Sequence, residues 1–159
     1  MRLVKRKGNK LVDVTDTKED TQEFLRHGAY RYEAGCGGLY GTITDYEHMA
    51  RMLCSNGMYQ GKQFLKPETV CLMHTEAQKQ HLEPEPGFTW GLSVKIRQNP
   101  ELSGSYAHKG TYGWSGAFGT HFFVCPDEKL EAVFMTNRSD LGGSGSYISE
   151  KVEELVFGS

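Results

Sequence analysis

Residues 108–120 read HKGTYGWSGAFGT, and an apolar run, HFFVC, follows directly at residues 121–125. Within the first stretch, small residues alternate with larger side chains that can contact a ligand: a histidine, a lysine, a tyrosine and a tryptophan. Small residues beside a strand let another group approach the backbone closely. The stretch therefore predicts one wall of a ligand-binding site that leads into a strand.

The rest of the second half also has the pattern of strands. The predicted strands cover residues 88–96, 105–112, 119–124 and 130–136. In the first of them, alternation places four apolar side chains on one face: Trp90, Leu92, Val94 and Ile96. The short connection through Pro126 predicts an antiparallel hairpin between the last two strands.

Three helices and a terminal hairpin complete the prediction. Thr44 and Glu47 fit a capping box that starts a helix ending at Asn56-Gly57. A second helix starts at Pro67 and a third covers residues 147–157. The side chains expected to face inward from these two helices are Val70, Leu72, Met73, Ile148, Val152, Leu155 and Val156. Two short runs around Gly8-Asn9 predict a hairpin over residues 1–15, so the fold class is α+β, an antiparallel β-sheet flanked by helices.

The composition is that of a globular domain. The chain has 159 residues, 38% of them hydrophobic and 24% charged, and its net charge is −2, so we expect no nucleic-acid partner. No run of about 18 apolar residues is present and no apolar region follows the basic N-terminal residues, so we expect no membrane contact and no signal peptide in this chain. The four cysteines form no CxxC pair and are expected to be free thiols. This favours the cytoplasm but leaves the compartment open.

The sequence patterns that could indicate catalysis, metal binding or phosphate binding are each better explained by a structural role. The six histidines show no HExxH spacing, so no metal and no cofactor is predicted. The glycine loop at 141–146 is read as a linker, because it lacks the phosphate-binding patterns of glycine loops. Residues 113–117, GWSGA, nearly match the G-x-S-x-G nucleophile elbow, but a strand-like run follows where the elbow needs a helix. Ser115 is therefore predicted to be a small residue at a strand entry, and no catalytic residue is assigned.

Four further segments occur in a recognisable order. Residues 37–46 read GGLYGTITDY, residues 57–70 read GMYQGKQFLKPETV, residues 112–120 read YGWSGAFGT, and VFMTN at 133–137 ends the last predicted hairpin. In this order and spacing they resemble motifs of the serine β-lactamase-like superfamily, which includes class C β-lactamases, DD-peptidases and related esterases. The resemblance covers about residues 1–157. It implies that the sheet and helices are the C-terminal part of the β-lactamase/transpeptidase-like fold.

The resemblance also implies a place for the substrate. The family's third motif, KTG or HTG, lies on the strand that faces the catalytic serine. Here it corresponds to His108–Gly110, Thr111–Gly113 or Trp114–Gly116, the last in the W-x-G form of related esterases. A true KTG is absent, so an ester or peptide-like substrate is expected rather than a β-lactam. The residues expected to bind a small ester or amide are His108, Tyr112, Gly113, Trp114, Ser115, Gly116, Phe118 and Gly119, with the backbone amide of Phe118 or Gly119 helping to hold the oxyanion.

Two motifs of the family are missing from the sequence. No serine has a lysine three residues on, and no tyrosine has an asparagine two residues on. In the family these S-x-x-K and Y-x-N motifs supply the nucleophile and the acid/base groups. We therefore expect residues 1–159 to be a single partial domain of a serine hydrolase, inactive alone, whose partner is the missing N-terminal part or a second copy. The alternative is a non-catalytic binding or oligomerisation module, because a truncated sheet leaves an edge strand.

Overall fold

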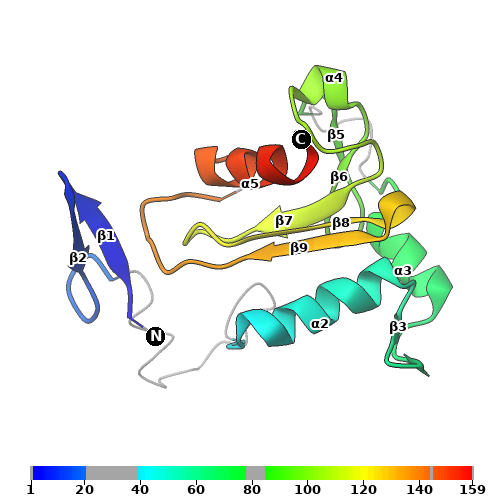
Figure 1. The fold of residues 1–159 in the computed structure, drawn as a ribbon, viewed down its shortest axis with the longest axis horizontal. Coiled ribbons are helices and arrows are strands. Elements are labelled where there is room, and N and C mark those ends of the chain that lie inside the picture. The colour runs from blue at the N-terminus through cyan, green and yellow to red at the C-terminus, as the bar shows by residue number, and fades with distance from the viewer. Residues whose placement is uncertain (1, 21–38, 78–84, 144, 159) are drawn as a thin grey trace.

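The computed structural model describes residues 2–20, 39–77, 85–143 and 145–158. Within these residues, the main sheet has five antiparallel strands in the order β5-β6-β7-β8-β9. Their bounds are β5 Phe88–Trp90, β6 Lys95–Arg97, β7 Tyr112–Ser115, β8 His121–Cys125 and β9 Leu130–Phe134. Helix α5, Tyr147–Phe157, covers one face of the sheet, and α2, Ile43–Cys54, covers the other (Figure 1). This arrangement confirms the predicted α+β class with an antiparallel sheet flanked by helices.

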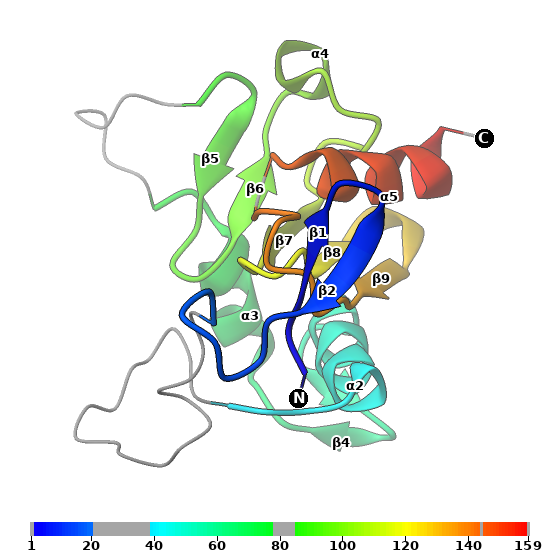
Figure 2. The ribbon, with the colours of Figure 1, turned by 90° about the vertical axis from the view of Figure 1, so that its left-hand side faces the viewer.

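Shorter elements surround this centre. They are β1 Val4–Lys7, β2 Lys10–Asp13, β3 Met58–Tyr59, β4 Lys62–Gln63, α3 Pro67–His74, α4 Pro100–Ser103 and a 3-10 turn at Pro126–Glu128. The β1–β2 hairpin turns at Gly8-Asn9, as predicted, and lies beside the end of the sheet (Figure 2). It is tied to the chain after β9, because the Val4 amide donates to the Asn137 carbonyl at 3.0 Å. Among the described residues, no helix is long and apolar enough to cross a membrane.

Helix α2 begins two residues earlier than the sequence predicted. Thr42, not Thr44, is the N-cap: its hydroxyl accepts from the Asp45 amide at 3.2 Å, and the Asp45 carboxylate accepts from the Thr42 amide at 2.8 Å. The predicted partner, Glu47, instead contacts Arg51 one turn later. The sequence holds two overlapping capping patterns, and the helix uses the earlier one.

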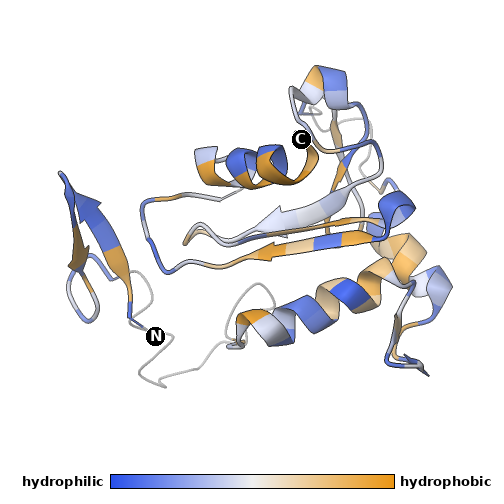
Figure 3. Cartoon of the chain, viewed as in Figure 1, coloured by the Kyte–Doolittle hydropathy of each residue, from blue (hydrophilic) through white to orange (hydrophobic). Residues whose placement is uncertain are grey.

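The main core lies between the sheet and helices α2 and α3. Its buried side chains are Ala50, Leu53, Val70, Val94, Ile96, Tyr112, Phe122 and Val124. Tyr112 is anchored there, since its hydroxyl donates to the Leu53 carbonyl at 3.3 Å. Figure 3 shows the apolar residues of β8 and β9 between the two helical layers. On the opposite face, Phe123 of β8 packs on Phe157 of α5, with ring centroids 5.3 Å apart.

The prediction of one strand over residues 88–96 is wrong. The segment is a hairpin: β5 ends at Trp90, the chain turns, and β6 pairs back so that Trp90 faces Lys95. The Gly91 amide donates to the Val94 carbonyl at 3.0 Å, and Leu92 is 70% exposed in the turn. A side chain on Gly91 would overlap the Met73 carbonyl at the end of α3, so this close approach explains the glycine.

The predicted strand at residues 105–112 is also wrong. Asn99 caps the short helix α4 by accepting from the Leu102 amide at 3.1 Å, and a turn region then leads to β7. In that region the Gly110 amide donates to the Arg97 carbonyl at 2.8 Å. Strand pairing begins only at Tyr112, which lies opposite Ile96 on one side and Val124 on the other.

The last hairpin and the C-terminal helix agree with the sequence prediction. β8 and β9 pair from His121–Phe134 to Cys125–Leu130 around the 3-10 turn, and α5 has the predicted bounds. Two side chains expected to face inward do not: Leu72 is 57% exposed and Leu155 is 80% exposed. In α5 the inward positions are taken instead by Ser149 and Glu153, one helical turn apart.

Candidate functional site

A pocket of about 370 Å³ opens where β7 turns into β8. Its lining side chains come from α2, β7, the connecting turn, β8 and β9: Tyr46, Trp114, Ser115, Gly116, Ala117, Thr120, His121, Phe122, Val133, Phe134 and Met135. The rim is aromatic, because Trp114 is 43% exposed and its ring contacts that of Trp90 in a tilted arrangement, with centroids 4.5 Å apart, while Tyr46 meets Phe122 edge to face at 5.3 Å. Such a surface suits a small ligand with an apolar part.

The structure brings five of the eight predicted substrate-binding residues together. Trp114, Ser115 and Gly116 line the pocket. Tyr112 and Gly113 continue along β7 and line a second, much smaller cavity of about 30 Å³, which also borders Trp114 and Ser115. Each of these five consecutive residues therefore borders at least one of the two cavities, while their side chains alternate between the two faces of the sheet.

The other three predicted residues lie outside both cavities. Phe118 forms an isolated bridge with Gly142, and Gly119 lies in the turn, where its amide donates to the Gly116 carbonyl at 3.1 Å. The Gly119 amide, one of the two oxyanion donors considered from the sequence, therefore has a partner within the turn. His108 lies near the opposite end of β7, where it contacts Glu128.

Ser115 and His121 are cross-strand partners on β7 and β8. The Ser115 hydroxyl oxygen lies 2.7 Å from Nδ1 of His121, and both side chains are buried, at 7% and 8% exposure. The contact with His121 on the neighbouring strand therefore fixes the orientation of the Ser115 hydroxyl.

A buried carboxylate from α5 extends this contact. Oε1 of Glu153 lies 3.3 Å from Nε2 of His121, and its Oε2 accepts hydrogen bonds from Arg97 at 2.6 Å and Ser105 at 2.7 Å. Burial by itself would raise the pKa of Glu153, but the contact with His121, the charge of Arg97 and the Ser105 hydroxyl together hold that pKa below its usual value. The carboxylate is therefore ionised near neutral pH, and we call these five side chains the Glu153 network.

The Glu153 network places a hydroxyl, an imidazole and a carboxylate in series, as hydrolytic triads do. Two features favour a structural role for Ser115. Strand β8 follows it rather than the helix that a nucleophile elbow needs, and its hydroxyl lies on the buried contact with His121. The Glu153 network directly holds β7, β8 and α5 together behind the pocket.

Sequence reasoning missed several residues of this site. Tyr46, Thr120, His121, Phe122 and the β9 residues come from elements whose place beside β7 depends on tertiary structure. One signal was available for the network: Ser149 and Glu153 lie one turn apart on the inward side of an otherwise amphipathic helix. A carboxylate at such a position needs buried partners.

Comparison with known proteins finds a matching family and similar sequences. The model of a family described as Beta-lactamase matches residues 5–156. Protein Rv1367c of Mycobacterium tuberculosis is 32% identical over 110 residues, which are 62% of this chain and 27% of that protein. Esterase EstB of Burkholderia gladioli is 26% identical over 116 residues, 72% of this chain and 28% of the esterase. The chain thus spans about a quarter of the length of these curated relatives.

A solved structure shares the fold. EstCE1, described as a hydrolase with promiscuous acyltransferase activity, superposes with a TM-score of 0.78 at 22% sequence identity. The match covers 98% of this chain and 43% of EstCE1. Nearly the whole described chain therefore has a counterpart in part of a larger hydrolase fold.

Proposed function

The chain belongs to the beta-lactamase family, and from that premise we propose that β7 is the substrate-binding strand of a serine hydrolase site for small esters or amides. One observation carries the proposal: Trp114, Ser115 and Gly116, the W-x-G segment, line the 370 Å³ pocket. The substrate class is of the esterase, amidase or peptidase type, which agrees with the hydrolase relatives EstB and EstCE1.

Each residue of the W-x-G segment has a distinct part in this proposal. Trp114 supplies an aromatic face, and its tilted ring contact with Trp90 supports that face at the pocket. Gly116 lets the turn close tightly beside the pocket, because a Cβ there would overlap the Thr120 hydroxyl. The contact of Ser115 with His121 holds β7 in place relative to α5.

Catalysis through an acyl-serine intermediate requires a nucleophile beyond these residues. The sequence contains no S-x-x-K and no Y-x-N motif, so we propose that the chain is inactive alone and acts with the remaining part of such a domain. In that assembly the Phe118 amide is the remaining backbone donor of the two considered for the oxyanion.

Ligand binding can be tested without turnover. Trp114 lines the pocket and Trp90 contacts it, so p-nitroacetanilide, a stable amide with a light-absorbing ring, should quench the tryptophan fluorescence saturably. Trp114→Phe should weaken this binding, whereas Leu92→Ala, in an exposed turn, should not. Quenching that is linear in ligand concentration, or equal in both variants, would contradict the proposed wall.

Inactivity is tested with p-nitrophenyl acetate. The chain alone should release nitrophenolate no faster than buffer containing the Ser115→Ala variant. Turnover by the wild-type chain that disappears in Ser115→Ala would show that Ser115 is a nucleophile after all. Turnover that persists in the variant would place the nucleophile elsewhere in the chain, and either result would refute the proposed inactivity.

A second candidate function rests on the edge of the sheet. Within the described residues, β9 pairs only with β8, so its other side presents backbone groups that a further strand can use. This favours a module that pairs through β9 with a second copy of the chain. Light scattering should then report a dimer that Val133→Pro disrupts, and a monomer across the concentration range counts against this function.

A further inference from the structure

The pocket is not the only place where reactive side chains meet, and we propose that His108, Cys125 and Glu128 bind a zinc-type divalent cation. One ligand atom from each of the three residues lies within 4.8 Å of the other two. The set combines an imidazole nitrogen, a thiol sulfur and a carboxylate oxygen. We call these three residues the 108/125/128 cluster.

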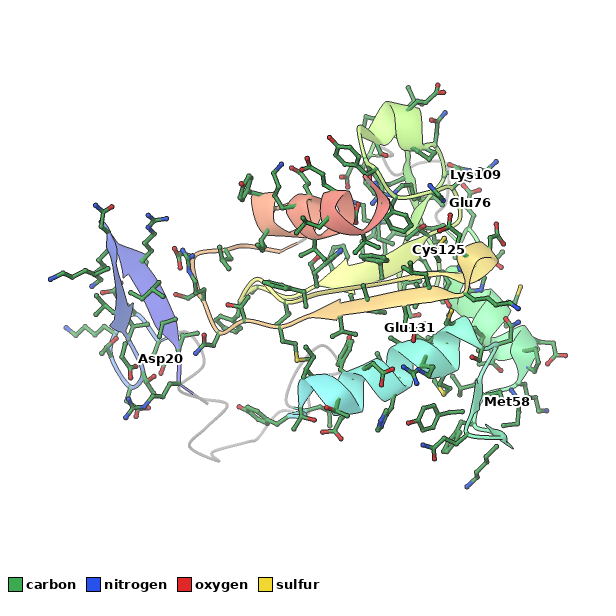
Figure 4. All side chains as sticks on the ribbon, viewed as in Figure 1. Asp20, Met58, Glu76, Lys109, Cys125 and Glu131 are labelled. Atoms are coloured by element: carbon green, nitrogen blue, oxygen red, sulfur yellow. The ribbon has the colours of Figure 1, made fainter. Side chains whose placement is uncertain are left out.

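The elements of the fold explain why the three side chains converge. Cys125 is the last residue of β8, and Glu128 ends the 3-10 turn that follows, so both belong to one tight bend. Figure 4 labels Cys125 at this end of the sheet, where the strand runs into the turn. Lys129, in the left-handed conformation with φ 53°, closes the bend before β9 starts.

His108 reaches the same bend from a different part of the chain. Its carbonyl accepts from the Thr111 amide at 3.1 Å, which fixes the turn just before β7. Its ring packs at 5.1 Å on Phe157 at the end of α5, and Nδ1 contacts the Glu128 carboxylate. The ring is therefore held on two sides with a nitrogen directed at the bend.

The chemistry of the donors selects the class of cation. Zinc binds thiolate, imidazole and carboxylate at about 2.0–2.3 Å in tetrahedral sites, and three protein ligands leave a fourth position for water. Magnesium and calcium prefer oxygen ligands only, so a cluster containing a thiol disfavours them. A tetrahedral site needs the three atoms somewhat closer than 4.8 Å, and His108 and Glu128 have exposed side chains that can move inward.

Binding changes the protonation of the cluster. His108 and Glu128 bind the cation through an imidazole nitrogen and a carboxylate oxygen, and the Cys125 thiol loses its proton to solvent as the metal–sulfur bond forms. Cys125 is 1% exposed, so its thiolate needs such a positive partner. Affinity must therefore rise with pH.

No metal motif is visible in the sequence because the ligands come from separate segments. Cys125 and Glu128 have the short spacing of a ligand pair, but His108 joins them only after β7 and β8 are paired. The cluster lies near the Val124 end of β8, whereas the pocket lies at the His121 end. A bound cation would link the turn before β7 to the bend after β8 without entering the pocket.

Cobalt provides a direct readout. Titration of the reduced chain with Co²⁺ should produce the absorption of a thiolate-bound, tetrahedral ion, and Zn²⁺ should displace it with one equivalent bound. His108→Ala and Glu128→Gln, both at exposed positions, should each weaken zinc binding by about tenfold or more, measured by competition with a chromophoric chelator. Cys125→Ser should abolish the thiolate band.

Matched controls change a carboxylate and a thiol outside the cluster. Asp127→Asn, on the same turn, and Cys71→Ser, an exposed free thiol on α3, should leave zinc affinity and the cobalt spectrum unchanged. Two results would overturn the site: no saturable binding of either ion, or binding that His108→Ala and Glu128→Gln leave intact. The second result stays informative if Cys125→Ser fails to fold, because the other two variants change exposed side chains.

Discussion

The Ser115 hydroxyl oxygen lies 2.7 Å from Nδ1 of His121, directly across the β7–β8 pair. Through Nε2 the same ring reaches Glu153, so a residue of the pocket wall is connected to the helix on the far face of the sheet. Changes to the Glu153 network should therefore alter both the stability of the fold and the position of the wall.

Removing the hydroxyl should leave the imidazole without this partner. We expect Ser115→Ala to lower the free energy of unfolding by about 1–3 kcal/mol, the usual cost of an unsatisfied buried polar group. Urea denaturation followed by circular dichroism measures the change. Ser93→Ala, at an exposed serine in the β5–β6 turn, is the matched control and should change little. Equal effects of the two substitutions would show that the Ser115–His121 contact contributes nothing.

Neutralising the central carboxylate should cost more. Glu153→Gln leaves Arg97, 6% exposed, without its charged partner, and breaking a buried ion pair from one side costs about 3–5 kcal/mol. Glu150→Gln, on the exposed side of the same helix, provides the comparison. The two variants should separate clearly in the midpoint of urea unfolding, and coincident curves would contradict a stabilising role for the Glu153 network.

Stability should also depend on the protonation of Glu153. Its folded pKa is below the ordinary value of 4.5, so the stabilisation is fully present above that value and is lost as pH falls through the folded pKa. The difference in unfolding free energy between wild type and Glu153→Gln should therefore shrink between about pH 6 and pH 3, because a protonated Glu153 resembles glutamine. A difference that stays constant over this range would mean that Glu153 does not titrate with a lowered pKa.

At Gly113 the pairing of β7 with β8 leaves no room for a side chain. A Cβ there would meet the Phe122 carbonyl oxygen, a backbone atom that cannot move aside cheaply. Gly113→Ala should therefore destabilise the chain by about 1–3 kcal/mol, as overpacking does. At Gly41 a Cβ would meet Asp45 at an ordinary 3.6 Å, so Gly41→Ala serves as the control. Thermal unfolding of both variants measures this difference. Equal unfolding temperatures would show that β7 and β8 are packed loosely enough to accept a side chain at Gly113.

The elements that could be predicted from the sequence are those with strong local signals. The β8–β9 hairpin and α5 have regular apolar patterns and clear ends, and the structure has them where expected. The β5–β6 hairpin was missed because alternation continues through its turn, and the reversal depends on the approach of Gly91 to α3. The pocket wall on β7 followed from motif resemblance, whereas the contacts of His121 and Glu153 depend on long-range packing that no local pattern encodes.

Cysteine reactivity offers a test of packing between α2 and the β8–β9 hairpin. Burial, reinforced by the nearby Glu131 carboxylate, raises the pKa of the Cys54 thiol to about 11. At about pH 8 only about one Cys54 side chain in a thousand is then a thiolate, the form that attacks alkylating agents. Iodoacetamide should therefore label the exposed Cys71 well before Cys54, as read by mass spectrometry of the peptides. Glu131→Gln removes the carboxylate but keeps the shape of the side chain, so it should speed Cys54 labelling while Cys71 labelling stays the same. If Cys54 reacts as fast as Cys71 in the folded wild-type chain, then α2 does not shield it against β9 as the structure describes.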